Sequence, residues 1–173
     1  MTATLAPLLE LVARDPALAA AVAAVGTERS YDLVGPEGLR PMVTAVLAAK
    51  APVLAVVATG READELVEAL GGVLDSASVA LFPSWETLPH ERLSPRADTV
   101  GRRMAVLRRL AHPEEGAADG QPPLRVVVSP VRSVLQPTLR GLGEIAPVRL
   151  AVGERADLEE ITDRLAALAY TRV

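Results

Sequence analysis

The sequence contains no cysteine and very few aromatic residues. Without cysteine, the chain of 173 residues has no disulfide bonds, no cysteine-based metal site and no cysteine nucleophile. Only 2% of the residues are aromatic whereas 50% are hydrophobic, so a core must be packed from alanine, valine and leucine. The length suits one large domain or two small ones.

Charge and hydropathy limit the environment in which we expect the chain. A formal net charge of −4 and a pI near 5.3 argue against a globally basic nucleic-acid-binding protein, although they leave room for a local basic surface. No uncharged run is long enough to span a bilayer, and the first residues lack the pattern of an export signal. The sequence therefore predicts a cytoplasmic protein with no membrane partner.

The residues that usually carry catalysis or bind metals are sparse. The two histidines, His90 and His112, have no carboxylate at ligand spacing on a shared helix face, so no metal site is expected. Spacing cannot test for a serine–histidine–aspartate triad, because its members need not be close in sequence. We therefore predict no catalytic residue.

Hydrophobic periodicity predicts alternating helices and strands after two short N-terminal helices. The continuous apolar run at residues 52–58 is typical of a strand that is buried on both faces of a parallel sheet. Such alternation indicates βαβ units and an α/β fold with a parallel sheet. We expect strands at residues 31–34, 52–58, 79–82, 126–128 and 147–152, and helices over 39–47, 63–74, 100–110 and 157–168.

Several short patterns predict where helices begin. Asp15 precedes a proline, and Thr59 with Glu62 forms a capping box. Ser94–Pro95 and Ser129–Pro130 repeat the pattern of a cap followed by proline. Two further expectations are a cap pair at Asp157 and Glu160, and a surface loop or linker over residues 112–123.

Residues 35–41 lie between an expected strand and an expected helix, which is where a phosphate-binding loop would lie. Such a loop needs glycines, a lysine for the phosphate oxygens and a hydroxyl for Mg²⁺. Gly35 and Gly38 are present, but Arg40, Pro41 and Met42 stand where the lysine and hydroxyl are needed. The sequence therefore favours an ordinary turn over ATP binding.

An arginine cluster follows the third expected strand, with Asp98 as its only acidic residue. Arg102 and Arg109 share a helix side, opposite an apolar stripe at Val100, Met104 and Leu107. This side is either a contact for phosphate or an acidic partner, or a solvated helix face. The cluster comprises Arg92, Arg96, Arg102, Arg103, Arg108 and Arg109.

Trp85 lies just before that cluster and also has two possible roles. It can cover the core, with its N–H bonded to a nearby carbonyl, or it can anchor an interface. The sequence favours the first.

The order of residues around Trp85 resembles a known family. Phe82-Pro83-Ser84-Trp85-Glu86-Thr87-Leu88-Pro89, then Ser94-Pro95-Arg96-Ala97-Asp98-Thr99, Arg102–Leu107 and Val126–Gln136, resemble the N-terminal region of bacterial transcription-repair coupling factor, Mfd. The high alanine, arginine and valine content is similar to that of an actinobacterial version. We call the residues Phe82, Pro83, Trp85, Glu86, Thr87, Leu88, Pro89, Ser94, Pro95 and Asp98 the signature.

The resemblance implies a fold and a domain division. The family's N-terminal region is similar to UvrB and is built on a helicase-like α/β domain with a degenerate phosphate loop, here Gly35 to Met42. This implies N-terminal helices at residues 1–30, the helicase-like domain at 31–142, and the truncated start of a small second α/β domain at 143–173. We expect that last part, from Pro147, to be poorly ordered or self-associating.

The resemblance also implies a function. The full-length family is an ATP-dependent DNA translocase that displaces stalled RNA polymerase at lesions and recruits UvrA for nucleotide excision repair. This chain is expected to be a fragment and a non-catalytic adaptor without a cofactor of its own, because ATP and Mg²⁺ serve the absent motor. Its expected partners are UvrA, through an incomplete contact surface, and the remainder of the parent protein, with RNA polymerase and DNA bound by absent modules.

Two alternatives stay open beside the adaptor role. One is a nucleotide-binding α/β enzyme domain, and the other is a DNA-binding module that uses the arginines between Arg92 and Arg109.

Overall fold

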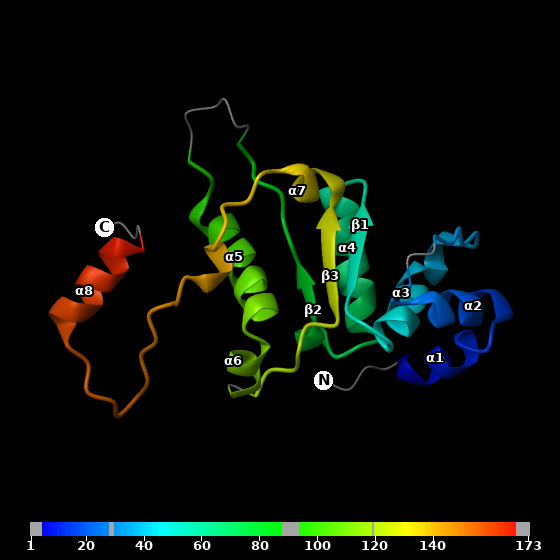
Figure 1. The fold of residues 1–173 in the computed structure, drawn as a ribbon, viewed down its shortest axis with the longest axis horizontal. Coiled ribbons are helices and arrows are strands. Elements are labelled where there is room, and N and C mark those ends of the chain that lie inside the picture. The colour runs from blue at the N-terminus through cyan, green and yellow to red at the C-terminus, as the bar shows by residue number, and fades with distance from the viewer. Residues whose placement is uncertain (1–4, 28–29, 88–93, 119, 169–173) are drawn as a thin grey trace. The chain divides into compact units, whose positions relative to one another are not determined.

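The computed structural model describes residues 5–27, 30–87, 94–118 and 120–168, in two compact units, Met1–Gly143 and Glu144–Val173. The first unit contains a parallel sheet flanked by helices (Figure 1), which confirms the predicted α/β class. In the described part of the chain, no helix is long and apolar enough to cross a membrane.

The sheet has three strands in the order β1-β3-β2, so β3 lies in the middle (Figure 1). The strands are β1 (Val53–Val57), β2 (Val79–Leu81) and β3 (Val126–Pro130), and both edge strands run parallel to β3. Every residue of β3 is buried, as expected for the central strand of a sheet with helices on both faces.

Helices precede, connect and follow the strands. The first unit contains α1 (Ala6–Val12), α2 (Pro16–Ala24), α3 (Arg40–Ala48), α4 (Gly60–Gly71), α5 (Ala97–Ala111), α6 (Pro113–Ala118) and α7 (Val131–Leu135). Single 3₁₀ turns occupy Glu37–Leu39, Ser76–Ser78 and Leu142–Glu144, and the second unit contains α8 (Leu158–Ala167).

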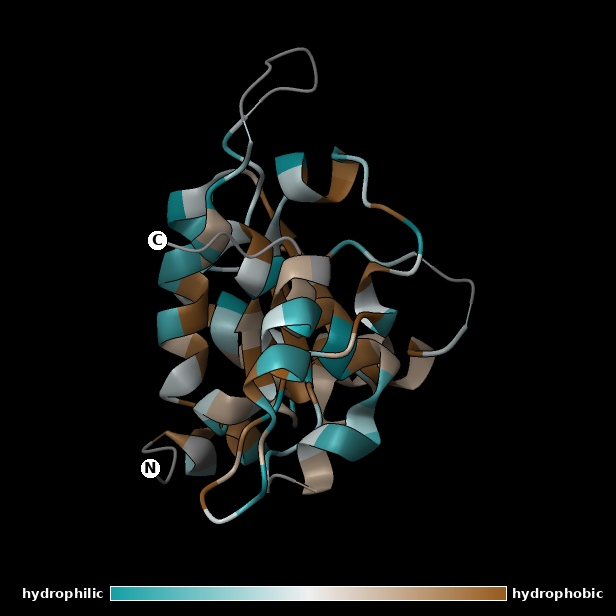
Figure 2. Cartoon of the chain, turned by 90° about the vertical axis from the view of Figure 1, so that its left-hand side faces the viewer, coloured by the Kyte–Doolittle hydropathy of each residue, from teal (hydrophilic) through white to brown (hydrophobic). Residues whose placement is uncertain are grey.

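The two faces of the sheet pack against different helices. One face forms the main core with α3 and α4, and α5 covers part of the other face through Val106. Brown, hydrophobic segments lie in the interior behind helices that carry both teal and brown residues (Figure 2). As expected, the main core is aliphatic, with buried residues Ala45, Ala48, Ala63, Leu70, Val73, Leu74, Val79, Val126 and Val128.

Three predicted helix caps are confirmed. The carboxylate of Asp15 accepts hydrogen bonds from the first turn of α2, and Asp157 does the same for α8. Thr59 Oγ1 accepts from the Glu62 backbone N–H at 3.2 Å, which starts α4. Each bond satisfies an amide that the helix itself leaves unpaired.

Three local predictions were wrong. The N-cap of α5 is Arg96 rather than Ser94–Pro95. Ser129 is a buried strand residue whose hydroxyl donates to backbone carbonyls, so it does not cap α7. The expected loop over residues 112–123 contains α6, whose first turn carries two acidic residues, Glu114 and Glu115, which suit the positive end of a helix.

Two predicted strands are absent from the sheet. Residues 31–34 have no regular structure and are exposed, and residues 147–152 likewise contain no strand. A short strand forms only when a neighbouring strand satisfies its amides and carbonyls. In the second unit Leu150 and Leu158 are 63% and 77% exposed.

The expectation that β1 is buried on both faces was also wrong. Val53, Ala55 and Val57 face the main core, but Leu54 and Val56 are 56% and 48% exposed. A continuous apolar run shows that both faces of a strand are apolar, but it does not show that a helix packs on each face.

Candidate functional site

The most unusual side chain in the structure is Arg103, which is fully buried in the middle of α5. Its Nη1 donates hydrogen bonds to the Pro83 carbonyl at 2.7 Å and to Ser133 Oγ at 2.8 Å. Its Nη2 donates to Thr138 Oγ1 at 3.0 Å. Arg103 therefore joins α5 to the segment after β2 and the segment after β3.

Two of the few aromatic side chains enclose the same guanidinium group. The Arg103 Cζ lies 4.0 Å from the centroid of the Phe82 ring and 4.2 Å from that of Trp85. The negative face of each ring attracts the cation, and such contacts strengthen when water is excluded. We call Phe82, Pro83, Trp85, Arg103, Ser133, Gln136 and Thr138 the arginine clamp.

Among the described residues, no acidic side chain balances the charge on Arg103. No carboxylate of the described residues forms an ion pair with it, and its Nε is buried without a hydrogen-bond partner among them. Burial lowers the pKa of Arg103 from its usual value, but a guanidinium remains charged at neutral pH. Carbonyl and hydroxyl dipoles and the two rings must therefore stabilise the cation.

The sheet topology explains why the clamp residues meet. β2 and β3 are parallel neighbours, so the segments that follow them leave from the same edge of the sheet (Figure 1). The Phe82 N–H donates to the Val128 carbonyl at 2.8 Å, which extends the pairing beyond β2. This edge is also where open parallel sheets generally bind ligands.

Gln136 fixes the backbone of Trp85. Its Oε1 accepts from the Trp85 N–H at 2.7 Å, and its Nε2 donates to the Trp85 carbonyl at 3.1 Å. The indole Nε1 donates to the Pro137 carbonyl at 3.5 Å, which confirms the expected bond to a nearby carbonyl. Trp85 itself is half-buried.

Glu86 connects the same segment to the start of α5. Its carboxylate accepts hydrogen bonds from the Thr99 hydroxyl and from the Arg96 backbone N–H, the latter at 3.5 Å. The bond from Thr99 is the main reason why the pKa of Glu86 lies below its usual value. A carboxylate at the positive end of a helix is also electrostatically favourable.

Part of the signature therefore has a defined structural role. Phe82, Pro83 and Trp85 belong to the clamp, and Glu86 anchors α5. Asp98 pairs with Arg96 at 3.2 Å on the surface. Thr87 and Pro95 are half-buried and Ser94 is exposed, whereas Leu88 and Pro89 lie outside the described residues.

The arginine cluster does not form the uniform surface that the sequence suggested. Arg103 was predicted as a possible partner contact, but its complete burial makes this wrong. Arg109 Nη2 donates to the carbonyls of Ala77 and Pro122, at 2.7 and 2.9 Å. Arg96 is exposed in its ion pair and Arg102 is exposed, whereas Arg92 lies outside the described residues.

Arg108 and the buried residues of α5 also differ from what the sequence predicted. Arg108 forms a bidentate ion pair with Glu115, at 2.6 and 2.8 Å. The buried residues of α5 are Thr99, Arg103 and Val106 rather than the Val100, Met104 and Leu107 stripe. Val100, Met104 and Leu107 are half-buried, so the most buried side of α5 lies beside the predicted stripe.

The expected degenerate phosphate loop is an exposed segment at residues 35–40 that contains one 3₁₀ turn, Glu37–Leu39. Gly35 and Gly38 are exposed, and an added Cβ would meet nothing within 4 Å at either position. Arg40 pairs with Glu37 at 2.9 Å. Pro41 lies in the first turn of α3, where it lacks an N–H, and Met42 packs partly against the main core.

The described residues do not meet the requirements of a metal site. Among the residues that the structure describes, no group of three or more histidine, aspartate or glutamate side chains is placed to hold a metal ion. Ser133, Gln136 and Thr138 were not predicted as site residues. They could have been found from the predicted sheet, because the segments that follow adjacent parallel strands lie at the same edge of a sheet.

Comparison with known proteins supports the resemblance that the signature indicated. No protein-family model matches the chain. The transcription-repair-coupling factors of Mycobacterium bovis and Mycobacterium tuberculosis are each 52% identical to it over 148 residues. The predicted resemblance is therefore confirmed: the chain is similar to transcription-repair-coupling factors over 86% of its own length, and it spans 12% of theirs.

Proposed function

We propose that the chain is a non-catalytic adaptor region of a transcription-repair-coupling factor. The observation that carries the proposal is 52% identity over 148 residues to two such factors. In this role the chain contributes a rigid α/β unit to a longer protein that displaces stalled RNA polymerase from DNA lesions. Its location would then be the bacterial cytoplasm, where transcription takes place.

The arginine clamp supports a structural role for the part of the signature that it contains. These residues bond to one another and to the segments after β2 and β3, and none of them forms a nucleophile–base pair of the kind that catalysis requires. The clamp instead fixes the surface at the carboxyl edge of the sheet, where a partner such as UvrA can be recognised.

A chimaera tests the proposed role. The matching region of a mycobacterial transcription-repair-coupling factor is replaced by this chain, and polymerase displacement and UvrA-dependent repair are measured in a reconstituted system. We expect both activities to be retained at levels close to those of the parent. A folded chimaera that hydrolyses ATP but does neither would contradict the proposal.

The non-catalytic part of the proposal has its own test. The Gly35–Met42 segment is exposed up to Arg40, contains no lysine and no hydroxyl side chain, and follows no strand, which supports the absence of nucleotide binding. Titration of the 173-residue chain with labelled ATP and Mg²⁺ should therefore give no saturable binding. Saturable binding in the micromolar range would favour the enzyme alternative.

Direct DNA binding is tested by gel retardation at two salt concentrations. The structure weakens this alternative, because Arg103 is buried and Arg109 is engaged with carbonyls. We expect no retardation at physiological salt. A retarded complex that weakens steeply with salt would show phosphate contacts.

A further inference from the structure

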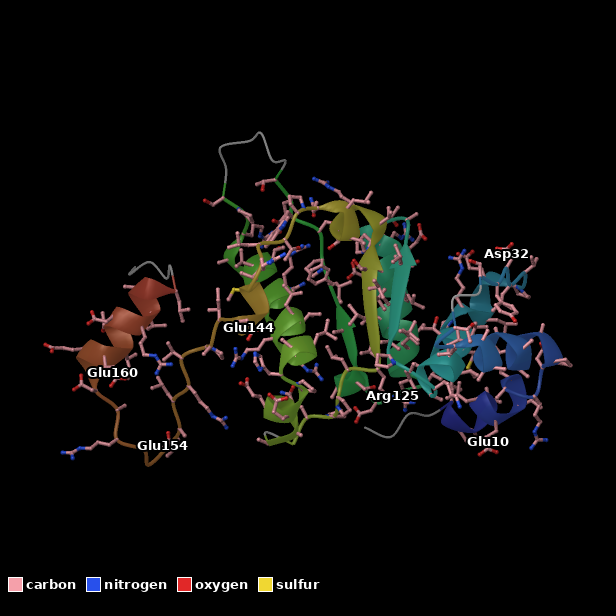
Figure 3. The ribbon with its side chains drawn as sticks, in the orientation of Figure 1. Glu10, Asp32, Arg125, Glu144, Glu154 and Glu160 are labelled. Carbon is pink, nitrogen blue, oxygen red and sulfur yellow. The ribbon has the colours of Figure 1, made fainter. Side chains whose placement is uncertain are left out.

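Residues 136–143, the last residues of the first unit, form a surface segment that we call the strap. β3 begins after Arg125 (Figure 3), and the strap follows its opposite end, after the short helix α7. All residues of the strap are described, and before the 3₁₀ turn at Leu142–Glu144 none of them belongs to a helix or a strand. Bonds to other segments must therefore hold the strap in place.

The first half of the strap completes the arginine clamp. Gln136 bonds both backbone groups of Trp85, at 2.7 and 3.1 Å, and the Pro137 carbonyl accepts from the indole Nε1 at 3.5 Å. Thr138 Oγ1 accepts from Arg103 Nη2 at 3.0 Å. Trp85 and Arg103 therefore keep these partners only while the strap stays in place.

The second half of the strap begins with a turn that requires glycine. The Leu142 N–H donates to the Leu139 carbonyl at 3.3 Å, and Gly141, the third residue of this turn, has a φ of 80°. Residues with a side chain rarely adopt a positive φ, and turns that need one at the third position use glycine there. The turn brings Gly143 to α5.

Gly143 packs against α5 more closely than a residue with a Cβ could without a shift of its neighbours. A Cβ at this position would lie 3.0 Å from the Leu107 carbonyl oxygen and 3.5 Å from the Ala111 Cβ. The Gly143 carbonyl also accepts a long hydrogen bond from Arg108 Nη1, at 3.5 Å. Arg108 is held in this position by its ion pair with Glu115 of α6. The strap is thus fixed at both ends, to the clamp and to α5.

Little apolar burial holds the strap between these ends. Residues 137–141 are exposed, and the largest apolar side chain among them, Leu139, is 76% exposed. Segments with few buried apolar contacts open locally at a lower free energy than the core. Every residue of β3, by contrast, is buried. The strap can therefore detach while the sheet stays folded.

We propose that the strap is a releasable device that couples Gly143, where the chain leaves the first unit, to the arginine clamp. When Gly143 leaves α5, the strap keeps only its attachment to the clamp, and its bonds to Arg103 and Trp85 then break more readily. Such coupling is reciprocal, so loss of the attachment to the clamp must loosen Gly143 by the same factor. Movement of the chain that follows Gly143 is in this way transmitted to the surface at Trp85. The proposal rests on packing and hydrogen bonds and is independent of a role in transcription-coupled repair.

Amide hydrogen exchange, followed by NMR, tests the coupling from Gly143 to the clamp. Gly143→Ala forces a Cβ against α5 and so disfavours the closed strap. Exchange of the Trp85 N–H, whose hydrogen-bond acceptor belongs to the strap, should then accelerate by about fivefold or more. The Phe82 N–H, which is bonded to Val128 in the sheet, should exchange at an unchanged rate.

Trypsin cleavage tests the coupling in the reverse direction. The bond after Arg140 lies inside the strap, so its cleavage rate follows the population of the detached strap. Gln136→Ala removes the bonds to Trp85 and should raise this rate by about fivefold or more. Cleavage after Arg155, which is exposed outside the strap, should not change and serves as the internal standard.

Gly101→Ala is the matched control in both measurements. It makes the same change in α5, but its Cβ meets no atom within 4 Å. Exchange of the Trp85 N–H and cleavage after Arg140 should both keep the rates of the unchanged chain.

Three results would overturn the proposal. The first is unchanged exchange of the Trp85 N–H in a folded Gly143→Ala chain, because the two ends of the strap would then open independently. The second is unchanged cleavage after Arg140 in Gln136→Ala, which is decisive even if Gly143→Ala does not fold. The third is equal acceleration of the Trp85 and Phe82 N–H groups in Gly143→Ala, because the sheet would then open together with the strap.

Discussion

The arginine clamp and the Gly35–Met42 segment are both polar connections in an aliphatic chain, but their structures differ. Arg103 is fully buried and bonds to Pro83, Ser133 and Thr138, which are distant in sequence. In the glycine segment, by contrast, Gly35 and Gly38 are exposed, and Arg40 forms its shortest ion pair with nearby Glu37. A polar segment is constrained when its bonds join distant parts of the chain. Four predictions test this difference between the arginine clamp and the Gly35–Met42 segment.

Arg103→Ala should have the largest effect. The substitution removes a buried cation, leaves a cavity between Phe82 and Trp85, and deprives Ser133 and Thr138 of their buried partner. We expect the free energy of unfolding to fall by about 3–5 kcal/mol, measured by urea denaturation. The control is Arg102→Ala, at the exposed neighbouring position, which should change it by about 0.5 kcal/mol or less. Equal effects would mean that the clamp is not a stabilising element.

Gln136→Ala should have an intermediate effect. It leaves the backbone N–H and carbonyl of Trp85 without their side-chain partners. A loss of about 1–3 kcal/mol is expected, together with a change in the fluorescence of the single tryptophan. Gln121→Ala, at an exposed position, should alter neither quantity. An unchanged emission spectrum in Gln136→Ala would contradict the proposed fixing of Trp85.

The Glu86 carboxylate should produce a smaller, pH-dependent effect. The bond from Thr99 lowers the pKa of Glu86 in the folded state. The ionised carboxylate therefore stabilises the fold at pH values above its unfolded pKa near 4.5. This stabilisation is lost as the pH falls through the lower pKa of the folded state. Thr99→Val should reduce this loss in acid unfolding followed by circular dichroism. If the free energy of unfolding of Thr99→Val falls with pH as steeply as that of the unchanged chain, Glu86 does not contribute to the loss of stability in acid.

Gly35→Ala and Gly38→Ala should have the smallest effect. Neither glycine has a positive φ, and neither has an atom within 4 Å of an added Cβ. We expect no loss of stability, or a gain of up to about 1 kcal/mol from the reduced freedom of the unfolded chain. Gly143→Ala is the contrasting control, because its Cβ would lie 3.0 Å from the Leu107 carbonyl oxygen. A large loss at Gly35 or Gly38 would indicate a constrained loop.

Much of the local structure could be predicted because it depends on neighbouring residues. Asp15, Thr59 and Asp157 cap helices through bonds within one turn, and the valine run at 126–128 forms the buried central strand. The strands expected at 31–34 and 147–152 failed for the opposite reason. A strand needs a partner that its own sequence cannot supply.

The clamp could be predicted only in part. Trp85 was expected to bond a carbonyl close to the core, and it does. The burial of Arg103 was not expected, because arginine is rarely fully buried without a charged partner. Its partners Ser133, Gln136 and Thr138 come from a segment that the sheet, rather than the chain order, brings to Arg103.

The sequence by itself determined the α/β class, the aliphatic core, three helix caps and the similarity to transcription-repair-coupling factors, because these follow from composition, from local bonds and from residue order. The tertiary structure decided which arginine is buried, which face of β1 is open, and where the signature acts. These features depend on parallel pairing of β2 with β3, which places distant segments at one edge of the sheet, and on which helices cover each face.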